Sequence, residues 1–104
     1  MFKLEPNPTF WAVVGITVPG DAVAGKLEVE FRHLGVSEWE AYRAKTAEQP
    51  LREVATGLIV GWRNVDVPYS AEALARLLDR WPRAAVDLFE AYGRELFEAR
   101  QKNS

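Results

Sequence analysis

The stretch KLEVEFR, residues 26–32, alternates strictly between charged and apolar side chains. Successive side chains of a β-strand point to opposite faces, so Leu27, Val29 and Phe31 share one face and the charged residues share the other. This pattern is typical of an antiparallel strand that buries one face and leaves the other in solvent. The stretch therefore predicts a half-buried strand.

A second strand is expected just before it, over FWAVVGITV, residues 10–18. This run is rich in β-branched and aromatic residues and ends at a Pro-Gly pair, which is a strong turn signal. Residues 19–25 are long enough to connect the two strands, so we interpret the pair as an antiparallel hairpin. Pro6 and Pro8 disfavour helix before it, which indicates an extended lead-in.

The first strand has apolar side chains on both faces. Val14 and Ile16 share one face, whereas Trp11 and Val13 lie on the other. A two-stranded hairpin is marginally stable in water and must pack against something. The protein's own helices are the favoured cover for the Trp11 face. Another strand or a partner chain, including a second copy in a homo-oligomer, is the alternative.

The rest of the chain has helical periodicity and predicts four helices. The first is predicted from Ser37, whose side chain would form a capping box with Glu40, to about residue 48. The second is predicted over residues 51–62, because apolar residues recur there at three- and four-residue spacing.

The third helix is predicted to have Ser70 as its N-cap and to end at Trp81, since a residue before proline disfavours helical geometry. Its expected buried stripe consists of Ala71, Leu74, Leu77, Leu78 and Trp81. The fourth helix is predicted over residues 83–100, and residues 101–104 are expected to fray. Its stripe consists of Ala85, Leu88, Phe89, Tyr92, Leu96 and Phe97.

Together these elements predict one domain over residues 1–104, of the α+β class, with an N-terminal antiparallel β-hairpin packed on about four helices. The lead-in and hairpin span residues 5–33, and the helical part spans residues 37–101. Hydrophobic residues make up 48% of the chain and charged residues 27%. This composition indicates a folded domain and not a disordered chain.

The residue types that carry enzyme and metal chemistry are sparse. Cysteine is absent, which excludes disulfides and thiolate zinc sites. His33 is the one histidine, and no nucleophile or acid is set beside it for catalysis. The carboxylates lack metal-loop spacing, and no glycine-rich phosphate loop is present. We therefore expect no catalytic residues, no metal and no cofactor, and a protein that is not an enzyme.

The charge and the hydropathy of the chain limit the classes of partner that it can bind. The net charge is -2 and the basic residues are scattered among acids, which argues against nucleic acid as a partner. No apolar stretch is long enough to span a bilayer, and the N-terminus lacks the features of a secretory signal. We therefore expect a cytoplasmic protein with neither nucleic acid nor membrane as partner.

Apolar surplus favours a protein-binding function. The chain has four tryptophans, and with the helical stripes they provide more apolar surface than a small domain is expected to hide. Trp62 and Trp81 lie in helical stripes and are assigned to the core. The sequence does not decide whether Trp11 and Trp39 belong to the core or to a protein interface. Tryptophan is enriched at the energetically important positions of interfaces.

The chain also carries a series of landmarks in a specific order. They are Pro6-Asn7-Pro8-Thr9-Phe10, Val18-Pro19-Gly20, Val29-Glu30-Phe31-Arg32-His33, Gly61-Trp62, Pro68-Tyr69-Ser70, Leu77-Leu78, Trp81-Pro82 and Tyr92. By their order and spacing, over nearly the whole chain, the protein resembles a family of phage tail assembly chaperones from long-tailed phages and prophages.

The resemblance implies a specific role. Such proteins bind the tape-measure protein while a tail is being built, keep it soluble, help to recruit tail-tube subunits and leave before the virion is complete. The role belongs to the cytoplasm of the bacterial host, and the family has no catalytic residues. Many members are also made in a longer form by ribosomal frameshifting.

A tape-measure protein is a long, largely helical chain, so its chaperone needs an apolar face or groove that accepts an amphipathic helix. The predicted contact residues are Trp11, Val13, Trp39 and Tyr42, because the core stripes claim these apolar groups least. Two alternatives stay open. One is a small structural tail or connector protein of the virion, and the other is a prophage-encoded regulator that binds protein.

Overall fold

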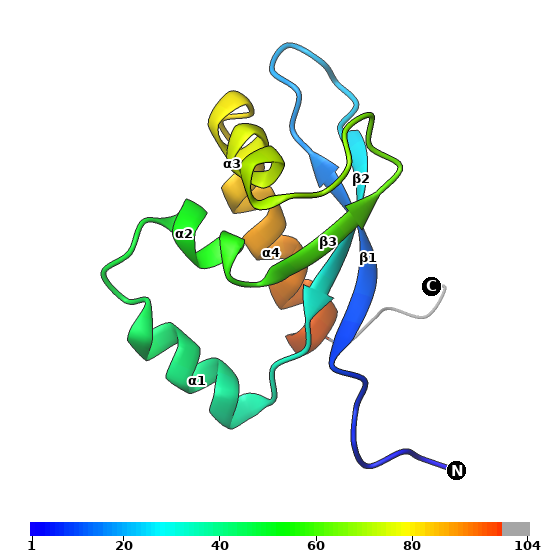
Figure 1. Cartoon of the computed structure of the whole chain (residues 1–104), viewed down its shortest axis with the longest axis vertical. Coiled ribbons are helices and arrows are strands. Elements are labelled where there is room, and N and C mark those ends of the chain that lie inside the picture. Colours follow the sequence, from blue (N-terminus) through cyan, green and yellow to red (C-terminus); the bar gives the residue numbers. More distant parts are fainter. Residues whose placement is uncertain (99–104) are drawn as a thin grey trace.

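The computed structural model describes residues 1–98, and Figure 1 shows how their helices and strands are arranged. The elements in chain order are β1 (Thr9–Ile16), β2 (Gly25–Arg32), α1 (Val36–Lys45), α2 (Leu51–Thr56), β3 (Ile59–Arg63), α3 (Ala71–Arg80) and α4 (Ala84–Phe97). The predicted α+β class, with an N-terminal hairpin and four helices, is confirmed.

The sheet has three antiparallel strands in the order β1-β2-β3, so β2 is central and the other two are edge strands. The hairpin pairs from Thr9 with Arg32 to Ile16 with Gly25. β3 pairs with the other edge of β2, and its register shifts at residues 30 and 31. The predicted hairpin is therefore confirmed, and a third strand extends it.

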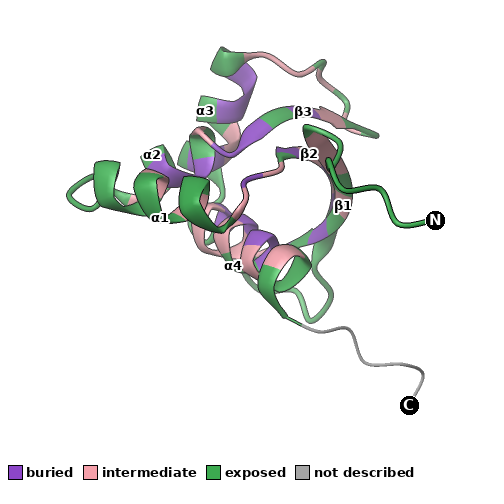
Figure 2. Ribbon diagram, turned by 90° about the horizontal axis from the view of Figure 1, so that it is seen from below, coloured by how far each residue is buried: buried purple, intermediate pink, exposed green. Residues whose placement is uncertain are grey.

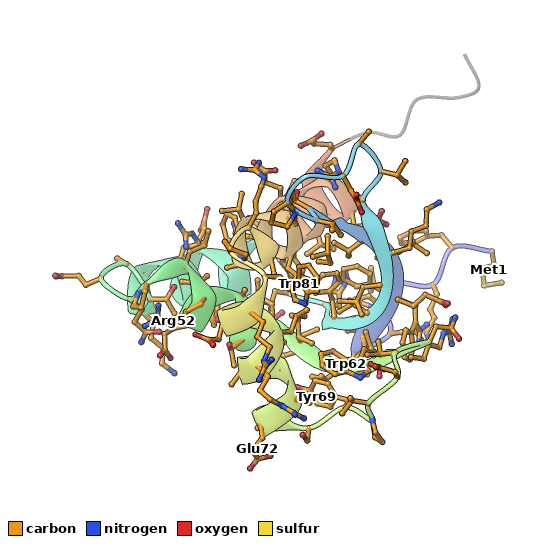
Figure 3. The ribbon with its side chains drawn as sticks, turned by 90° about the horizontal axis from the view of Figure 1, so that it is seen from above. Met1, Arg52, Trp62, Tyr69, Glu72 and Trp81 are labelled. Carbon is orange, nitrogen blue, oxygen red and sulfur yellow. The ribbon has the colours of Figure 1, made fainter. Side chains whose placement is uncertain are left out.

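The alternation in the hairpin matches its burial. Val14 and Ile16 of β1 are buried, as are Leu27, Val29 and Phe31 of β2. The four helices lie on this side of the sheet, with buried residues between the two layers (Figure 2). Within residues 1–98, no helix covers the opposite face (Figures 2 and 3), so the expectation that the protein's own helices cover the Trp11 face is wrong for the described residues.

β3 replaces the second half of the helix that the apolar spacing predicts over residues 51–62. That prediction is wrong beyond Thr56, where α2 ends. The chain then joins the free edge of β2, and the Arg32 N–H donates to the Leu58 carbonyl at 2.8 Å. Gly57 is a poor helix residue, and the β-branched pair Ile59-Val60 suits a strand. The part of the chain expected to be helical after residue 37 therefore includes a strand.

α1 begins at Val36, and the capping box predicted for Ser37 and Glu40 is wrong. Gly35 is the N-cap residue, and its N–H donates to the Glu38 carboxylate at 2.8 Å. Glu38 is the third residue of the helix, which is the position from which a glutamate side chain reaches back to the cap. The helix start is therefore earlier than the sequence predicts.

The start of α3 is as predicted. The Ser70 side chain accepts a hydrogen bond from the Ala73 N–H at 3.0 Å, which satisfies one of the free amides of the first turn. The helix ends at Arg80, and Trp81 is extended, with φ -110° and ψ 101°, as a residue before proline should be.

The predicted buried stripe of α3 is partly wrong. Leu74 and Leu78 are buried, but Ala71 and Trp81 are exposed. The assignment of Trp81 to the core fails because the extended backbone before Pro82 takes its side chain off the helical stripe. Trp81 instead lies at the surface.

α4 packs on the inner face of the sheet beside β1 and is bonded to both ends of that strand's hairpin. The Tyr92 hydroxyl donates to the Arg32 carbonyl at 2.8 Å, and Tyr92 is fully buried. At the far end, the Thr17 N–H donates to the Asp87 carboxylate at 2.7 Å. α4 ends at Phe97 and Glu98 is extended, so the prediction that this helix continues to residue 100 is wrong at Glu98. The prediction that residues 101–104 fray lies outside the described residues.

Candidate protein-binding surfaces

The uncovered face of the sheet carries Trp11 and Val13. Strand pairing places Trp11 opposite Glu30 and Val13 opposite Glu28. Trp11 is 40% exposed and Val13 is 63% exposed. We call this surface, formed by Trp11, Val13, Glu28, Glu30 and Arg63, the open sheet face. It is a mixed patch in which two apolar side chains lie beside acids.

Arg63 of β3 spans the open sheet face. Its guanidinium carbon lies 4.1 Å from the centroid of the Trp11 ring, and its Nε lies 2.9 Å from the Glu28 carboxylate. A cation–π contact at an exposed site contributes about 0.5–1 kcal/mol. Arg63 therefore covers part of one face of the Trp11 ring.

Trp39 and Tyr42 lie on the other side of the sheet, in an aromatic cluster between α1 and α4. The centroid of the Trp39 ring is 5.4 Å from that of Tyr92, 6.0 Å from that of Phe89 and 5.6 Å from that of Phe97. We call this group the α1–α4 aromatic cluster. No residue of α1 is fully buried, so these half-buried rings attach the helix to the rest of the molecule.

Tyr42 also connects α1 to α2. Its hydroxyl donates a hydrogen bond to the Val54 carbonyl at 2.6 Å. Burial raises the pKa of Tyr42 above 10.0, although the nearby charges of Arg32 and Arg43 act in the opposite direction. The hydroxyl is thus committed to the fold, and the exposed part of the ring is what remains for a partner.

The four predicted contact residues therefore occupy two places. Trp11 and Val13 are together on the open sheet face, and Trp39 and Tyr42 are together in the α1–α4 aromatic cluster, whose rings stack at 6.2 Å. The sheet lies between the two pairs, so no single surface holds all four.

A third apolar surface lies between α3 and the sheet, and sequence reasoning missed it. A hollow of about 350 Å³ is lined by Trp62, Val65, Leu77 and Trp81, among others. A second hollow of about 270 Å³ shares Val65, Leu77 and Trp81 and reaches the end of the hairpin at Ile16. We call the two joined hollows the α3 groove. Figure 3 looks onto this region, with Trp62 and Trp81 labelled.

One wall of the α3 groove is the loop between β3 and α3, and aromatic side chains fix that loop. The Trp62 indole N–H donates to the Val67 carbonyl at 2.9 Å, and the Tyr69 hydroxyl donates to the Ile59 carbonyl at 3.3 Å. The Trp62 and Tyr69 rings meet edge to face at 5.3 Å. The loop is therefore held against the sheet from both of its ends.

Trp81 forms the other wall and is 38% exposed. One signal in the sequence could have revealed this position. Helical geometry is disfavoured for a residue directly before proline, and Trp81 accordingly leaves the buried stripe of α3. The groove as a whole had no such signal, because its residues come from all three strands, the loop before α3, and α3 itself.

The rim of the α3 groove is positively charged. Arg76, Arg80 and Lys26 line it, and Asp66 is the acid among its lining residues. Within residues 1–98, the ion pairs involve Arg63 and Arg83 and none involves Arg76, Arg80 or Lys26. These three positive charges are therefore available to a partner.

The remaining features offer less for binding or chemistry. A third hollow, of about 560 Å³, is lined by Arg52, Glu53 and Asp79 among others and is more polar than the α3 groove. In the part of the chain that the structure describes, no group of three or more metal-ligating side chains comes together. No helix of residues 1–98 combines the length and apolar character needed to cross a membrane.

Comparison with protein families gives a match that covers almost the whole chain. The model of a family described as phage tail assembly chaperone matches residues 1–103. Comparison with curated proteins and with solved structures gives no match.

Proposed function

Because this chain belongs to the phage tail assembly chaperone family, we propose that it binds the tape-measure protein while the tail is being built and leaves before the virion is complete. The match over residues 1–103 is the observation that carries this proposal. A chaperone family is not an enzyme class. We propose that the chain acts by binding alone, in the cytoplasm of the bacterial host.

The apolar surface of the described residues suits this role. A long helical chain with apolar stripes aggregates unless the stripes are covered until assembly. Trp11, Val13 and Trp81 present apolar area at the surface, and charged residues surround each of them. An apolar centre with a polar rim is the usual anatomy of a non-obligate protein interface.

A chaperone that leaves must bind each site on its partner with modest affinity. A long partner offers several such sites, and linked sites strengthen the overall binding without strengthening any single contact. Each copy can then be displaced as the tail grows around the tape-measure protein. We propose the tail-tube protein as a second partner in that step.

As contacts we propose Trp11 and Val13 on the open sheet face, and the exposed parts of Trp39 and Tyr42 in the α1–α4 aromatic cluster. Self-association is proposed as a separate use of β1, because an edge strand has unpaired backbone groups along one side.

Co-expression tests the role. Expressed alone, the tape-measure protein should be found mainly in the insoluble fraction, and expressed with this chain it should move to the soluble fraction. An equally insoluble tape-measure protein in both cultures would contradict the proposal. Mass spectrometry of purified virions should find the tape-measure protein without this chain. A stoichiometric amount of this chain in virions would instead indicate a structural tail or connector protein.

The contact residues need a matched comparison. The variant Trp11→Ser/Val13→Ser should weaken the binding of the tape-measure protein at least tenfold, because it removes the apolar centre of the open sheet face. The control is Val23→Ser/Val36→Ser, which removes two other exposed apolar side chains and should bind as wild type. Unchanged binding by a folded Trp11→Ser/Val13→Ser protein would remove this face from the interface.

A further inference from the structure

The two hollows of the α3 groove meet at Leu77 and Trp81. The first extends to Trp62 and the second extends to Leu27. We infer that the groove binds one amphipathic helix of a protein partner, with apolar side chains in the two hollows and acidic residues along the flanks. The inference rests on the proposed function only for the identity of the protein that carries this helix.

The dimensions suit a helix with two apolar anchors. A cavity of about 150 Å³ holds a benzene ring, so hollows of about 350 and 270 Å³ each accept a large apolar side chain. Side chains three or four positions apart lie on the same face of a helix, which presents two anchors to two adjoining hollows.

An extended peptide suits the groove less well. Strand-like binding depends on free backbone groups at the edge of a sheet. One long wall of the groove is instead α3, whose backbone groups are bonded within the helix, and the Trp81 N–H is also used, since it donates to the Leu77 carbonyl at 3.1 Å. The groove therefore recognises side chains and not a free backbone.

The positive charges at the rim of the α3 groove favour a bound helix that has acidic residues on both sides of its apolar stripe. Arg76 and Arg80 are four residues apart on α3, so they lie on one face and repel each other. Glu72 lies one turn before Arg76, but among residues 1–98 no ion pair joins them. Lys26 adds a third positive charge on the side of the hairpin. Acidic residues on both flanks of the bound helix would pair with these groups.

The fold positions Trp81 at the centre of the α3 groove before a partner binds. The proline after it fixes an extended backbone, and the side chain stands at the junction of both hollows while 38% exposed. Tryptophans at the centre of an interface often carry a large share of the binding free energy. A position that is already fixed by the fold loses little freedom on binding.

Two synthetic helical peptides test the inference with the full chain. Both carry the same leucine stripe at positions i, i+4 and i+7, one with glutamate flanks and the other with lysine flanks. Fluorescence anisotropy of labelled peptides should show that the glutamate peptide binds at least tenfold more tightly than the lysine peptide. Equal affinities, or tighter binding of the lysine peptide, would overturn the inference.

Charge reversal at the rim makes the test specific to the groove. Arg76→Glu/Arg80→Glu should weaken the glutamate peptide at least tenfold and strengthen the lysine peptide. Lys45→Glu/Arg52→Glu makes the same change of net charge on α1 and α2 and should leave both affinities within twofold of wild type. If both variants change the affinities equally, the effect is one of net charge and the groove is not the site.

A change at the centre of the groove gives a second, independent test. Trp81→Ser should weaken the glutamate peptide at least tenfold, whereas Trp11→Ser on the open sheet face should not. Both side chains are partly exposed, and thermal melting checks that each variant is folded. A folded Trp81→Ser protein that binds as wild type would overturn the inference.

The same variants separate this inference from the proposed function. If wild type keeps the tape-measure protein soluble and Arg76→Glu/Arg80→Glu/Trp81→Ser does so equally well, the groove is not the partner site and the proposed function stands. If wild type does not keep the tape-measure protein soluble but binds the glutamate peptide as described, the proposed function fails and the groove remains a binding site.

Discussion

At the scale of single residues, Tyr92 of α4 connects its helix to β1, β2 and α1. Its ring contacts Phe10 of β1, Phe31 of β2 and Trp39 of α1, at centroid distances of 5.9, 5.3 and 5.4 Å. Its hydroxyl donates to the end of β2. Burial raises the pKa of Tyr92 from 10.0 to about 12. The folded protein therefore retains this proton at pH values where the unfolded chain releases it.

This shift predicts a loss of stability at alkaline pH. The contribution of Tyr92 is fully present below pH 10 and declines as the pH rises through about 12, because its pKa is higher in the folded state. Two pKa units correspond to about 2–3 kcal/mol of unfolding free energy. Urea unfolding of wild type at pH 8 and above pH 11 should show the decline. Burial also raises the pKa of Tyr42 and Tyr69, so wild type has further contributions of the same sign.

The variant Tyr92→Phe is the matched comparison. It should cost about 1–2 kcal/mol at pH 8, because it leaves the Arg32 carbonyl without this hydrogen bond. Its stability should then decline less than that of wild type between pH 8 and pH 12. An equal decline in both proteins would contradict the assignment to Tyr92.

Gly57 is a second residue whose identity the structure explains. A Cβ added at this position would collide with the Tyr42 hydroxyl, which approaches the backbone to reach the Val54 carbonyl. Gly57→Ala should therefore destabilise the protein by about 1–3 kcal/mol, the usual cost of overpacking. Chemical denaturation measures this, and Tyr42→Phe/Gly57→Ala should cost less than the sum of the two single changes. Strict additivity would show that the two side chains do not interfere.

At the scale of elements, the hairpin could be predicted because its information is local. Residues 26–32 repeat every second position, and the fold keeps that alternation. β3 could not be predicted in this way. Leu58 and Trp62 are four residues apart, which also fits a helix, and the edge of β2 that decides the matter lies about thirty residues earlier in the chain.

The candidate site likewise has a part that local sequence predicts and a part that depends on contacts between distant segments. The two-residue period of β1 could place Trp11 and Val13 together on the face opposite Val14 and Ile16, but it could not show that no helix would cover that face. The partial burial of Trp39 and Tyr42 depends on rings of α4, and the α3 groove depends on side chains from all three strands, the loop before α3, and α3. Contacts between segments far apart in sequence leave no local pattern.

The N-termini of α1 and α3 give a prediction that distinguishes the caps in the structure from the caps that the sequence predicts. Ser70→Ala should destabilise the protein by about 1 kcal/mol, because the Ser70 side chain caps α3. Ser37→Ala should have little effect, because Glu38 and Gly35 form the start of α1. Thermal melts of both variants measure this. If Ser37→Ala lowers the stability as much as Ser70→Ala does, the capping box of Ser37 and Glu40 that the sequence predicts is correct after all.

At the scale of the whole molecule, two of the apolar surfaces, the open sheet face and the α3 groove, differ in position and in charge. The open sheet face lies on the side of the sheet that no helix of residues 1–98 covers (Figure 2), whereas the α3 groove lies between α3 and the sheet. They share no residue, and their charges differ, since Glu28 and Glu30 border the first and Arg76 and Arg80 border the second.

Two surfaces without shared residues should act independently. The losses in affinity for the tape-measure protein caused by Trp11→Ser/Val13→Ser and by Arg76→Glu/Arg80→Glu should add as free energies within about 0.5 kcal/mol when all four changes are combined. Titration calorimetry of the two double variants and the combined variant measures this. A combined loss no larger than either alone would mean that both sets of residues belong to one coupled interface.

The central claim is that this chain binds the tape-measure protein directly and in several copies. Light scattering on the complex purified after co-expression measures its mass, and therefore its stoichiometry. We predict a soluble complex of one tape-measure chain with several copies of this chain, because a long partner repeats its apolar stripes. A tape-measure protein that stays insoluble, or that purifies without this chain, would contradict the account.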